Sequence, residues 1–286
     1  MQEYTQYLQF ILLFGLIGAI LLWVAKSNGY FHLPPHPEKR LHQVTFKTVV
    51  VVFAIYIGMT MLIAPLLAGI IQSTVSPDSL VNSLGWLQLF LLIGTFLLFY
   101  LFCRAQDPEM FKRIWKDRSI PHPKPITTDF FMGVMSWIIS FPLVIAIGQL
   151  ADLLLHFFFG FENYEQVAVR YLKTTLGSPS MLAVALFTIL IAAPVIEEFL
   201  FRGCLQNFFK RHTAPKNAIV LSALCFSLFH LAPSQGLGNI SLVASLFVFA
   251  LFLGFIYERQ SSLAASIGLH MTFNAVSTFR ILFYPE

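Results

Sequence analysis

Eight long apolar runs limit what this chain can fold into. They occupy about residues 7–25, 48–71, 86–103, 129–158, 180–201, 217–231, 241–257 and 263–283. A helix needs about 20 predominantly apolar residues to cross a bilayer. Continuously apolar runs, without the alternation of a barrel strand, are typical of helices in lipid. The sequence therefore predicts an all-α, polytopic transmembrane helix bundle with about eight spans.

The composition excludes a soluble globular protein. Hydrophobic residues make up 57% of the chain and charged residues only 11%, against about 25% charged in soluble domains. With a mean hydropathy of +0.74, the chain has too little polar surface to cover a 32.4 kDa core. A nucleic-acid partner is excluded in the same step. The net charge of +4 has another origin, because most of the 18 Lys and Arg residues lie in four short loops.

The basic loops alternate along the chain. They are residues 26–47, 104–127, 202–216 and 258–262. The basic residues of the loops between them are Arg170 and Lys173. By the positive-inside rule the basic loops are cytoplasmic and both termini lie outside. The sequence thus predicts a multi-pass integral protein of the cell (inner) membrane, with the lipid bilayer as its surroundings.

Ionisable side chains within apolar spans are costly and indicate function by default. Few are present: Asp152 and His156 in the fourth run, Glu197, Glu198 and Arg202 in or just beyond the fifth, His230 at the end of the sixth, and His270 with the amide Asn274 in the last. One carboxylate, two imidazoles and one amide therefore occupy three of the last four spans. The rest of that half of the chain is almost free of charge.

Helix geometry separates the two glutamates. Glu198 and Arg202 are four residues apart, acid before base, so they share one helix face as a structural ion pair. Glu197 is turned by about 100° from Glu198 and lacks that cation. Pro194 removes a backbone hydrogen bond one turn earlier, which opens or bends the helix there. Glu197 is therefore the candidate general base or acid.

The remaining polar groups suit hydrolysis, although each also has a purely structural interpretation. His270 and Asn274 are four residues apart and can donate two hydrogen bonds to one oxygen atom. Together with Glu197 and His230 they suit water activation and stabilisation of a tetrahedral oxyanion, as in acyl transfer to water or peptide hydrolysis. Alternatively, these histidines and the amide form interhelical hydrogen bonds. Asp152 and His156 fit an interface pair near the outer headgroups.

Three motifs carry a family resemblance. Glu-Glu-x-x-x-Arg at 197–202, Phe-x-x-x-His at 226–230 and His-x-x-x-Asn at 270–274 occur in this order on apolar runs. This pattern resembles the CPBP family, the CAAX prenyl endopeptidases of the Ras-converting type and their prokaryotic relatives, which include bacteriocin self-immunity proteins. The resemblance covers about residues 130–283. It implies N-terminal transmembrane helices (three spans) with basic loops over 1–127 and a catalytic transmembrane domain over 128–286.

The resemblance also implies a role for each motif residue. Glu197 with His230 would activate the water, and His270 with Asn274 would form the oxyanion hole. Glu198 and Arg202 would hold the helix, and Phe226 belongs to the second motif. Glu197, His230 and His270 could also form a His₂Glu zinc site. The sequence leaves the cofactor open between Zn²⁺ and none, and the spacing over three helices favours a metal-free site, because zinc is usually anchored by a local i, i+4 pair.

The predicted function is therefore an intramembrane endopeptidase acting on a membrane-associated protein or peptide, with its site reached from the cytoplasmic half. The alternatives are a polytopic transporter or proton relay, and a non-enzymatic membrane immunity or scaffold protein. A transporter would be expected to show an inverted repeat with broken helices, and the sequence shows none. One tension remains, because Glu197 and His230 are predicted to lie at depths that differ by about 10 Å. A tilted helix, or a sixth helix that begins in the cytosol, would have to absorb this difference.

Overall fold

The computed structural model describes residues 2–33, 44–117, 123–161 and 167–283. Over these ranges the chain is helical, and its β-type pairing is limited to an isolated bridge between Lys116 and Ser262. The prediction of an all-α polytopic bundle is confirmed. Six stretches are long and apolar enough to cross a membrane by length and composition: Tyr4–Ser27, Phe46–Thr74, Ser79–Gln106, Ile126–Phe159, Pro179–Phe209 and Gly238–Gln260.

Although six stretches of the described residues, rather than the predicted eight or so, are long and apolar enough to span a membrane, the helices cover all eight predicted runs. They are α1 (Gln2–Ser27), α2 (Phe46–Ile57), α3 (Ala64–Thr74), α4 (Pro77–Gln106), α5 (Met110–Trp115), α6 (Ile126–Phe159), α7 (Val167–Thr175), α8 (Pro179–Phe187), α9 (Ala193–Glu198), α10 (Asn207–Phe209), α11 (Pro215–Phe229), α12 (Gly238–Gln260) and α13 (Leu263–Phe283). A π-helical segment, Gly58–Ile63, joins α2 to α3. Two more, Thr188–Ala192 and Phe199–Gln206, join α8, α9 and α10 into one rod.

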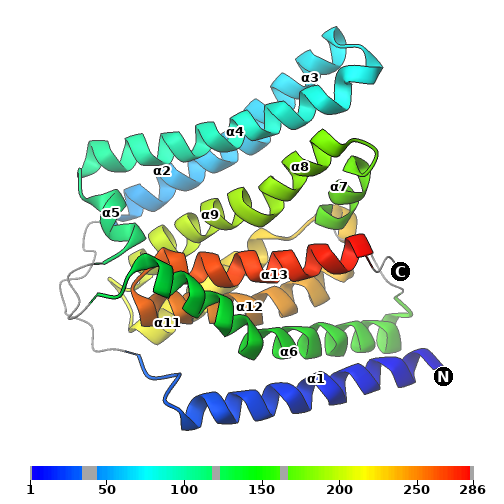
Figure 1. The fold of residues 1–286 in the computed structure, drawn as a ribbon, viewed down its shortest axis with the longest axis vertical. Coiled ribbons are helices and arrows are strands. Elements are labelled where there is room, and N and C mark those ends of the chain that lie inside the picture. The colour runs from blue at the N-terminus through cyan, green and yellow to red at the C-terminus, as the bar shows by residue number, and fades with distance from the viewer. Residues whose placement is uncertain (1, 34–43, 118–122, 162–166, 284–286) are drawn as a thin grey trace.

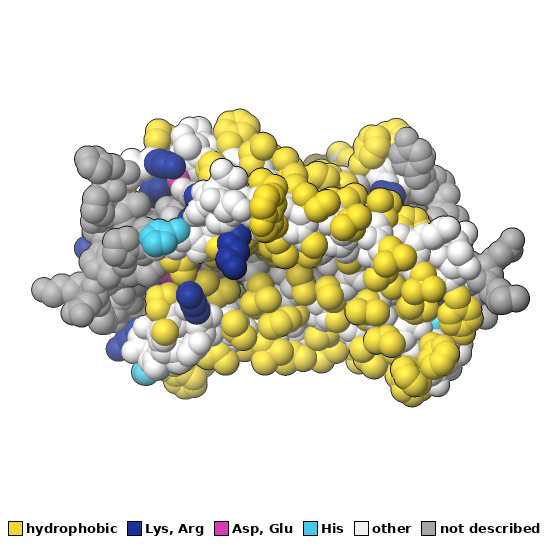
Figure 2. Space-filling model, turned by 90° about the horizontal axis from the view of Figure 1, so that it is seen from below, with side chains coloured by type: hydrophobic (Ala, Val, Ile, Leu, Met, Phe, Trp, Pro, Cys, Tyr) yellow, Lys and Arg dark blue, Asp and Glu magenta, His cyan; other side chains and the backbone are white. Residues whose placement is uncertain are grey.

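Apolar side chains cover the middle of the bundle's surface, and basic side chains gather mainly at one end, as expected for a protein in a membrane. In Figure 1 the helices run roughly side by side, and both termini lie at the end opposite the connections that follow α1, α5, α10 and α12. Figure 2 shows hydrophobic side chains over the middle of one face and basic side chains mainly toward one end. Large apolar side chains such as Leu12 and Phe90 are 70% exposed. This is typical of a multi-pass membrane protein. The predicted loop residues Lys39, Arg40 and Arg118 lie outside the described residues.

Two glycines bring α6 and α13 into close contact. A Cβ atom added to Gly133 would overlap the backbone oxygen of Ala265, and one added to Gly268 would overlap that of Phe130. The two backbones therefore touch, as small residues allow in membrane helix pairs. Because Gly268 lies two residues before His270, this contact also fixes the part of α13 that carries the histidine.

The rod α8–α10 continues beyond its predicted end. The apolar run was expected to end at residue 201 with Arg202 in a basic loop, but the helix runs on to Phe209 and Arg202 is fully buried. Glu197 is therefore about 18 Å from the end of the rod, and His230 lies about 22 Å from Pro215 at the start of α11. The predicted mismatch in depth is largely removed, because the polar residues after position 201 pair with α12 instead of facing water.

Candidate active site

The three motifs meet at one carboxylate oxygen. Glu197 comes from α9, His230 follows the last residue of α11, and His270 lies in α13. The Nε2 atom of His230 is 3.6 Å from Glu197 Oε2, and the Nε2 atom of His270 is 3.9 Å from the same oxygen. Both distances are longer than a direct hydrogen bond. The structure thus places a carboxylate and two imidazoles, far apart in the sequence, around one point.

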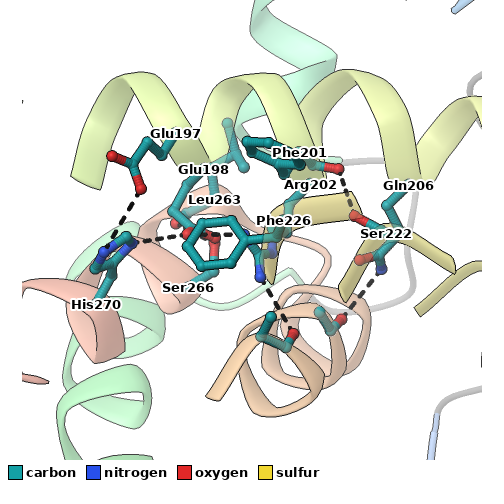
Figure 3. A network of polar contacts seen from close by, with 12 residues as sticks. Glu197, Glu198, Phe201, Arg202, Gln206, Ser222, Phe226, Leu263, Ser266 and His270 are labelled. Carbon is teal, nitrogen blue, oxygen red and sulfur yellow. Dashed lines mark hydrogen bonds and ion pairs between the residues drawn. The ribbon is translucent and has the colours of Figure 1, made fainter. Parts of the chain in front are cut away.

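The Nδ1 atoms of both histidines form hydrogen bonds to groups other than Glu197. His230 Nδ1 is 2.8 Å from the carbonyl oxygen of Phe226. A carbonyl oxygen only accepts, so this nitrogen carries the hydrogen. His270 Nδ1 is 2.9 Å from Glu198 Oε1, and it donates when that carboxylate is ionised. In both rings the Nε2 atom is left to face Glu197, as Figure 3 shows for His270.

Glu198 has two partners rather than one. Arg202 Nη1 lies 3.1 Å from Glu198 Oε1, and both side chains are fully buried. The other partner is His270, which binds the same carboxylate oxygen. The i, i+4 spacing predicted the contact with Arg202. It carried no signal for the contact with His270, which comes from a helix 72 residues further along the chain.

Phe226 contacts both Arg202 of the ion pair and His230 of the site. The guanidinium carbon of Arg202 is 4.5 Å from the centre of its ring, a cation–π contact. The centre of the His230 ring is 4.6 Å away on the same helix, and that of Phe201 is 5.1 Å away with its edge toward Phe226. Phe226 is fully buried. Its ring therefore packs against both the buried guanidinium and the His230 imidazole.

A ladder of polar contacts continues from Arg202 away from the site. Gln206 Nε2 donates to Gly254 O and to Glu258 Oε2, at 3.1 and 3.3 Å. Lys210 Nζ pairs with Glu258 Oε1 at 2.9 Å. Arg202, Gln206 and Lys210 are spaced by four residues and share the face that meets α12. Gln206 and Glu258 were not among the predicted site residues, although the four-residue repeat was a signal for Gln206.

Asn274 lies one turn after His270 and contacts the rod of α8–α10. Its Nδ2 atom donates to the carbonyl oxygen of Ile189, at 2.8 Å. That carbonyl lies in the π-helical segment just before Pro194. The amide predicted as an oxyanion-hole donor thus has one of its two hydrogens engaged by backbone.

The N-terminal spans also contribute to the surroundings of the site. The ring of Tyr56 from α2 lies 5.8 Å from that of Phe229, the residue before His230. The ring of Phe53, also from α2, is 5.4 Å from Phe201. The sequence offered no way to single out these aromatic residues, because aromatic residues in an apolar run are normally part of the core.

Asp152 and His156 belong to another part of the bundle. The His156 ring is 5.0 Å from Tyr4 and 6.2 Å from Tyr7, both on α1. Its Nδ1 atom is 3.4 Å from Phe161 O, at the end of α6 that Figure 1 places beside the N-terminus. His156 thus lies on the α1 side of the bundle, and Asp152 is hydrogen-bonded to Ser241 of α12, so neither residue lies with Glu197.

The site is open on one side. The side chain of His230 is 30% exposed and that of Glu197 is 16% exposed, whereas that of His270 is 6% exposed. An open surface hollow of about 440 Å³ lies between α11 and α12. Its apolar lining includes Leu228 and Leu231, which suits an apolar chain rather than a charged ligand.

A zinc ion requires a definite spacing of its ligand atoms. At about 2.0–2.2 Å from a tetrahedral zinc, they lie about 3.3–3.6 Å from one another. The Nε2–Oε2 distance of 3.6 Å to His230 is at the upper limit of this spacing, and that of 3.9 Å to His270 exceeds it. Among the residues that the structure describes, no group of three or more His, Cys, Asp or Glu side chains meets the geometry of a metal site. As arranged, Glu197 and His270 lie too far apart for the His₂Glu zinc site with an open position that the sequence allowed.

Comparison with known proteins supports the three motifs. Residues 179–276 match the family of type II CAAX prenyl endopeptidases, Rce1-like. This Rce1-like segment runs from α8 into α13 and contains all three motifs. The resemblance to CPBP membrane proteases is thereby confirmed over this part of the chain, which is shorter than the predicted 130–283. The match supports a membrane endopeptidase. Neither the curated proteins nor the solved structures contain a match to the chain.

Proposed function

We propose that this protein is a membrane-embedded endopeptidase that hydrolyses a peptide bond of a membrane-associated protein or peptide. The observation that carries the proposal is the approach of two imidazole Nε2 atoms to one oxygen of Glu197. A water molecule bound between Glu197 Oε2 and His230 Nε2 would be the nucleophile. The Rce1-like match favours this function over a transporter, a proton relay or an immunity or scaffold protein.

Each side chain has a defined part in the reaction. Glu197 accepts a proton from the water as its oxygen bonds to the scissile carbonyl carbon, and His230 Nε2 orients that water. The carbonyl oxygen becomes an oxyanion, which accepts hydrogen bonds from protonated His270 Nε2 and from the second amide hydrogen of Asn274. The proton on Glu197 then passes to the amide nitrogen as the carbon–nitrogen bond breaks.

Glu198 and Arg202 do not touch the reacting atoms and act through His270. The buried carboxylate of Glu198 accepts from His270 Nδ1 and so stabilises the imidazolium that the oxyanion requires. Arg202 is the cationic partner of that buried carboxylate. The proposed chemistry needs no metal, and the site is reached from the half of the bilayer next to the basic loops.

The test is cleavage of membrane peptides by purified protein in nanodiscs, read by mass spectrometry. Glu197→Gln should lower turnover by about 10²–10⁴-fold, the usual contribution of a general base, with an unchanged melting temperature. Glu109→Gln is the matched control, because Glu109 is an exposed surface residue. Turnover of Glu197→Gln within threefold of wild type would contradict the assignment. Loss of activity with a chelator, restored by Zn²⁺, would contradict the metal-free mechanism.

A further inference from the structure

In the register of the π-helical segment before Pro194, the expected backbone partner of the Ile189 carbonyl is the proline nitrogen. In the π-helical segment Thr188–Ala192, the N–H of Ala193 donates to Thr188 O, five residues back. The next position in this register is Pro194, which has no N–H to donate to Ile189 O. Asn274 of α13 supplies the missing hydrogen through its Nδ2 atom, at 2.8 Å. A side chain thus replaces the donor that the proline lacks.

This hydrogen bond joins the two helices that carry most of the proposed site. Pro194 lies three residues before Glu197 in α9, and Asn274 lies four residues after His270 in α13. A second bond between the same parts of the bundle, from His270 Nδ1 to Glu198 Oε1, lies one turn earlier in α13. Two bonds on one face fix both the distance between two helices and their rotation. In lipid, neighbouring helices commonly satisfy carbonyls freed by proline, and π-helical segments are frequent at functional sites.

We infer that Pro194 and Asn274 form a positioning pair, in which the carbonyl exposed by the proline holds the Asn274 amide and thereby aligns α9 with α13. An amide nitrogen carries two hydrogens. With one bound to Ile189 O, the rotation of the amide is fixed, and the other hydrogen keeps a constant direction toward the substrate oxygen. Pro194 itself touches no reacting atom and acts only through Asn274. The inference rests on the proposed function.

The decisive variant is Pro194→Ala. Its restored N–H can bind Ile189 O, so the rod gains a backbone bond while Asn274 loses its anchor. We expect the melting temperature to stay equal or rise while kcat falls about 10–100-fold, below the loss seen on removing an oxyanion donor, with KM within threefold. A proline needed only for folding would give the opposite, a fall in stability together with activity.

A double-mutant comparison tests the pair without relying on catalysis. Asn274→Ala leaves Ile189 O without a donor and should lower the melting temperature. In Pro194→Ala/Asn274→Ala the new backbone N–H satisfies that carbonyl, so the melting temperature should recover while kcat stays low. The matched control is Pro142→Ala, which changes a buried proline inside α6 and should leave kcat unchanged.

The outcomes separate this inference from the proposed function. A Pro194→Ala enzyme with kcat within threefold of wild type would overturn the positioning pair. A double mutant no more stable than Asn274→Ala would also overturn it, by contradicting the shared carbonyl. If wild type cleaves peptides no faster than Glu197→Gln, the proposed function fails. The stability comparison then still decides whether Pro194 and Asn274 act on the same carbonyl.

Discussion

Removing either member of the Glu198–Arg202 pair should destabilise the protein, and the two losses should differ. The charged atoms are 3.1 Å apart and both side chains have no exposed area. At an effective dielectric constant of about 20, their attraction is about 5 kcal/mol. A buried charge left without its partner costs about 3–5 kcal/mol. These values exceed the few tenths of a kcal/mol of an exposed helical pair.

The remaining partners set the order of the two losses. In Arg202→Ala, Glu198 keeps the hydrogen bond from His270 Nδ1, so we expect a loss near the lower limit, about 3 kcal/mol. In Glu198→Ala, the guanidinium keeps Ala250 O, at 3.2 Å, the face of Phe226 and the charge of the Glu197 carboxylate. Among the residues that the structure describes, its Nε atom has no hydrogen-bond partner. We therefore expect a loss near the upper limit, about 5 kcal/mol.

The assay is the free energy of unfolding from titration with a denaturing detergent in mixed micelles. The double variant Glu198→Ala/Arg202→Ala leaves no unpaired charge, so it should be more stable than Glu198→Ala alone. The exposed pair Lys112–Glu109, at 3.0 Å, is the control and should contribute less than about 1 kcal/mol. Strictly additive losses in the double variant, or a loss below about 1 kcal/mol for Glu198→Ala, would refute this reasoning.

Three further outcomes follow from the packing and the loops. A cysteine replacing Lys112 should resist a membrane-impermeant maleimide in intact cells, whereas one replacing Ser76 should react; the reverse pattern would invert the topology. Gly268→Ala should destabilise the protein by about 1–3 kcal/mol in detergent unfolding, because its Cβ would meet an α6 carbonyl, and an unchanged stability would contradict the close contact. Phe226→Leu should lower stability by about 1–2 kcal/mol through loss of the cation–π contact with Arg202; equal stability would remove that contact from the account.

Much of the fold was accessible because membrane helices are encoded locally. An apolar run of about 20 residues can satisfy its backbone in lipid only as a helix, so the runs predict the rods without knowledge of their neighbours. The same locality makes the contact between Glu198 and Arg202 predictable, since residues four apart share a face. The end of the rod α8–α10 could not be predicted from the local sequence. Arg202 and Gln206 stay in the helix because α12 supplies carbonyl acceptors for them.

The composition of the site was in the sequence, and its geometry was not. Glu197, His230 and His270 stood out because charge within lipid is costly. Which atoms face one another depends on the rotation and depth of three helices, and these are set by contacts such as the glycines between α6 and α13. The sequence therefore determined which residues are candidates. Only the tertiary structure decided that both imidazole Nε2 atoms face Glu197 and that Glu198 binds His270 Nδ1. It also decided that Asn274 donates to Ile189 O, five residues before Pro194. The physical reason is that hydrogen bonds between helices depend on packing across long separations in the chain.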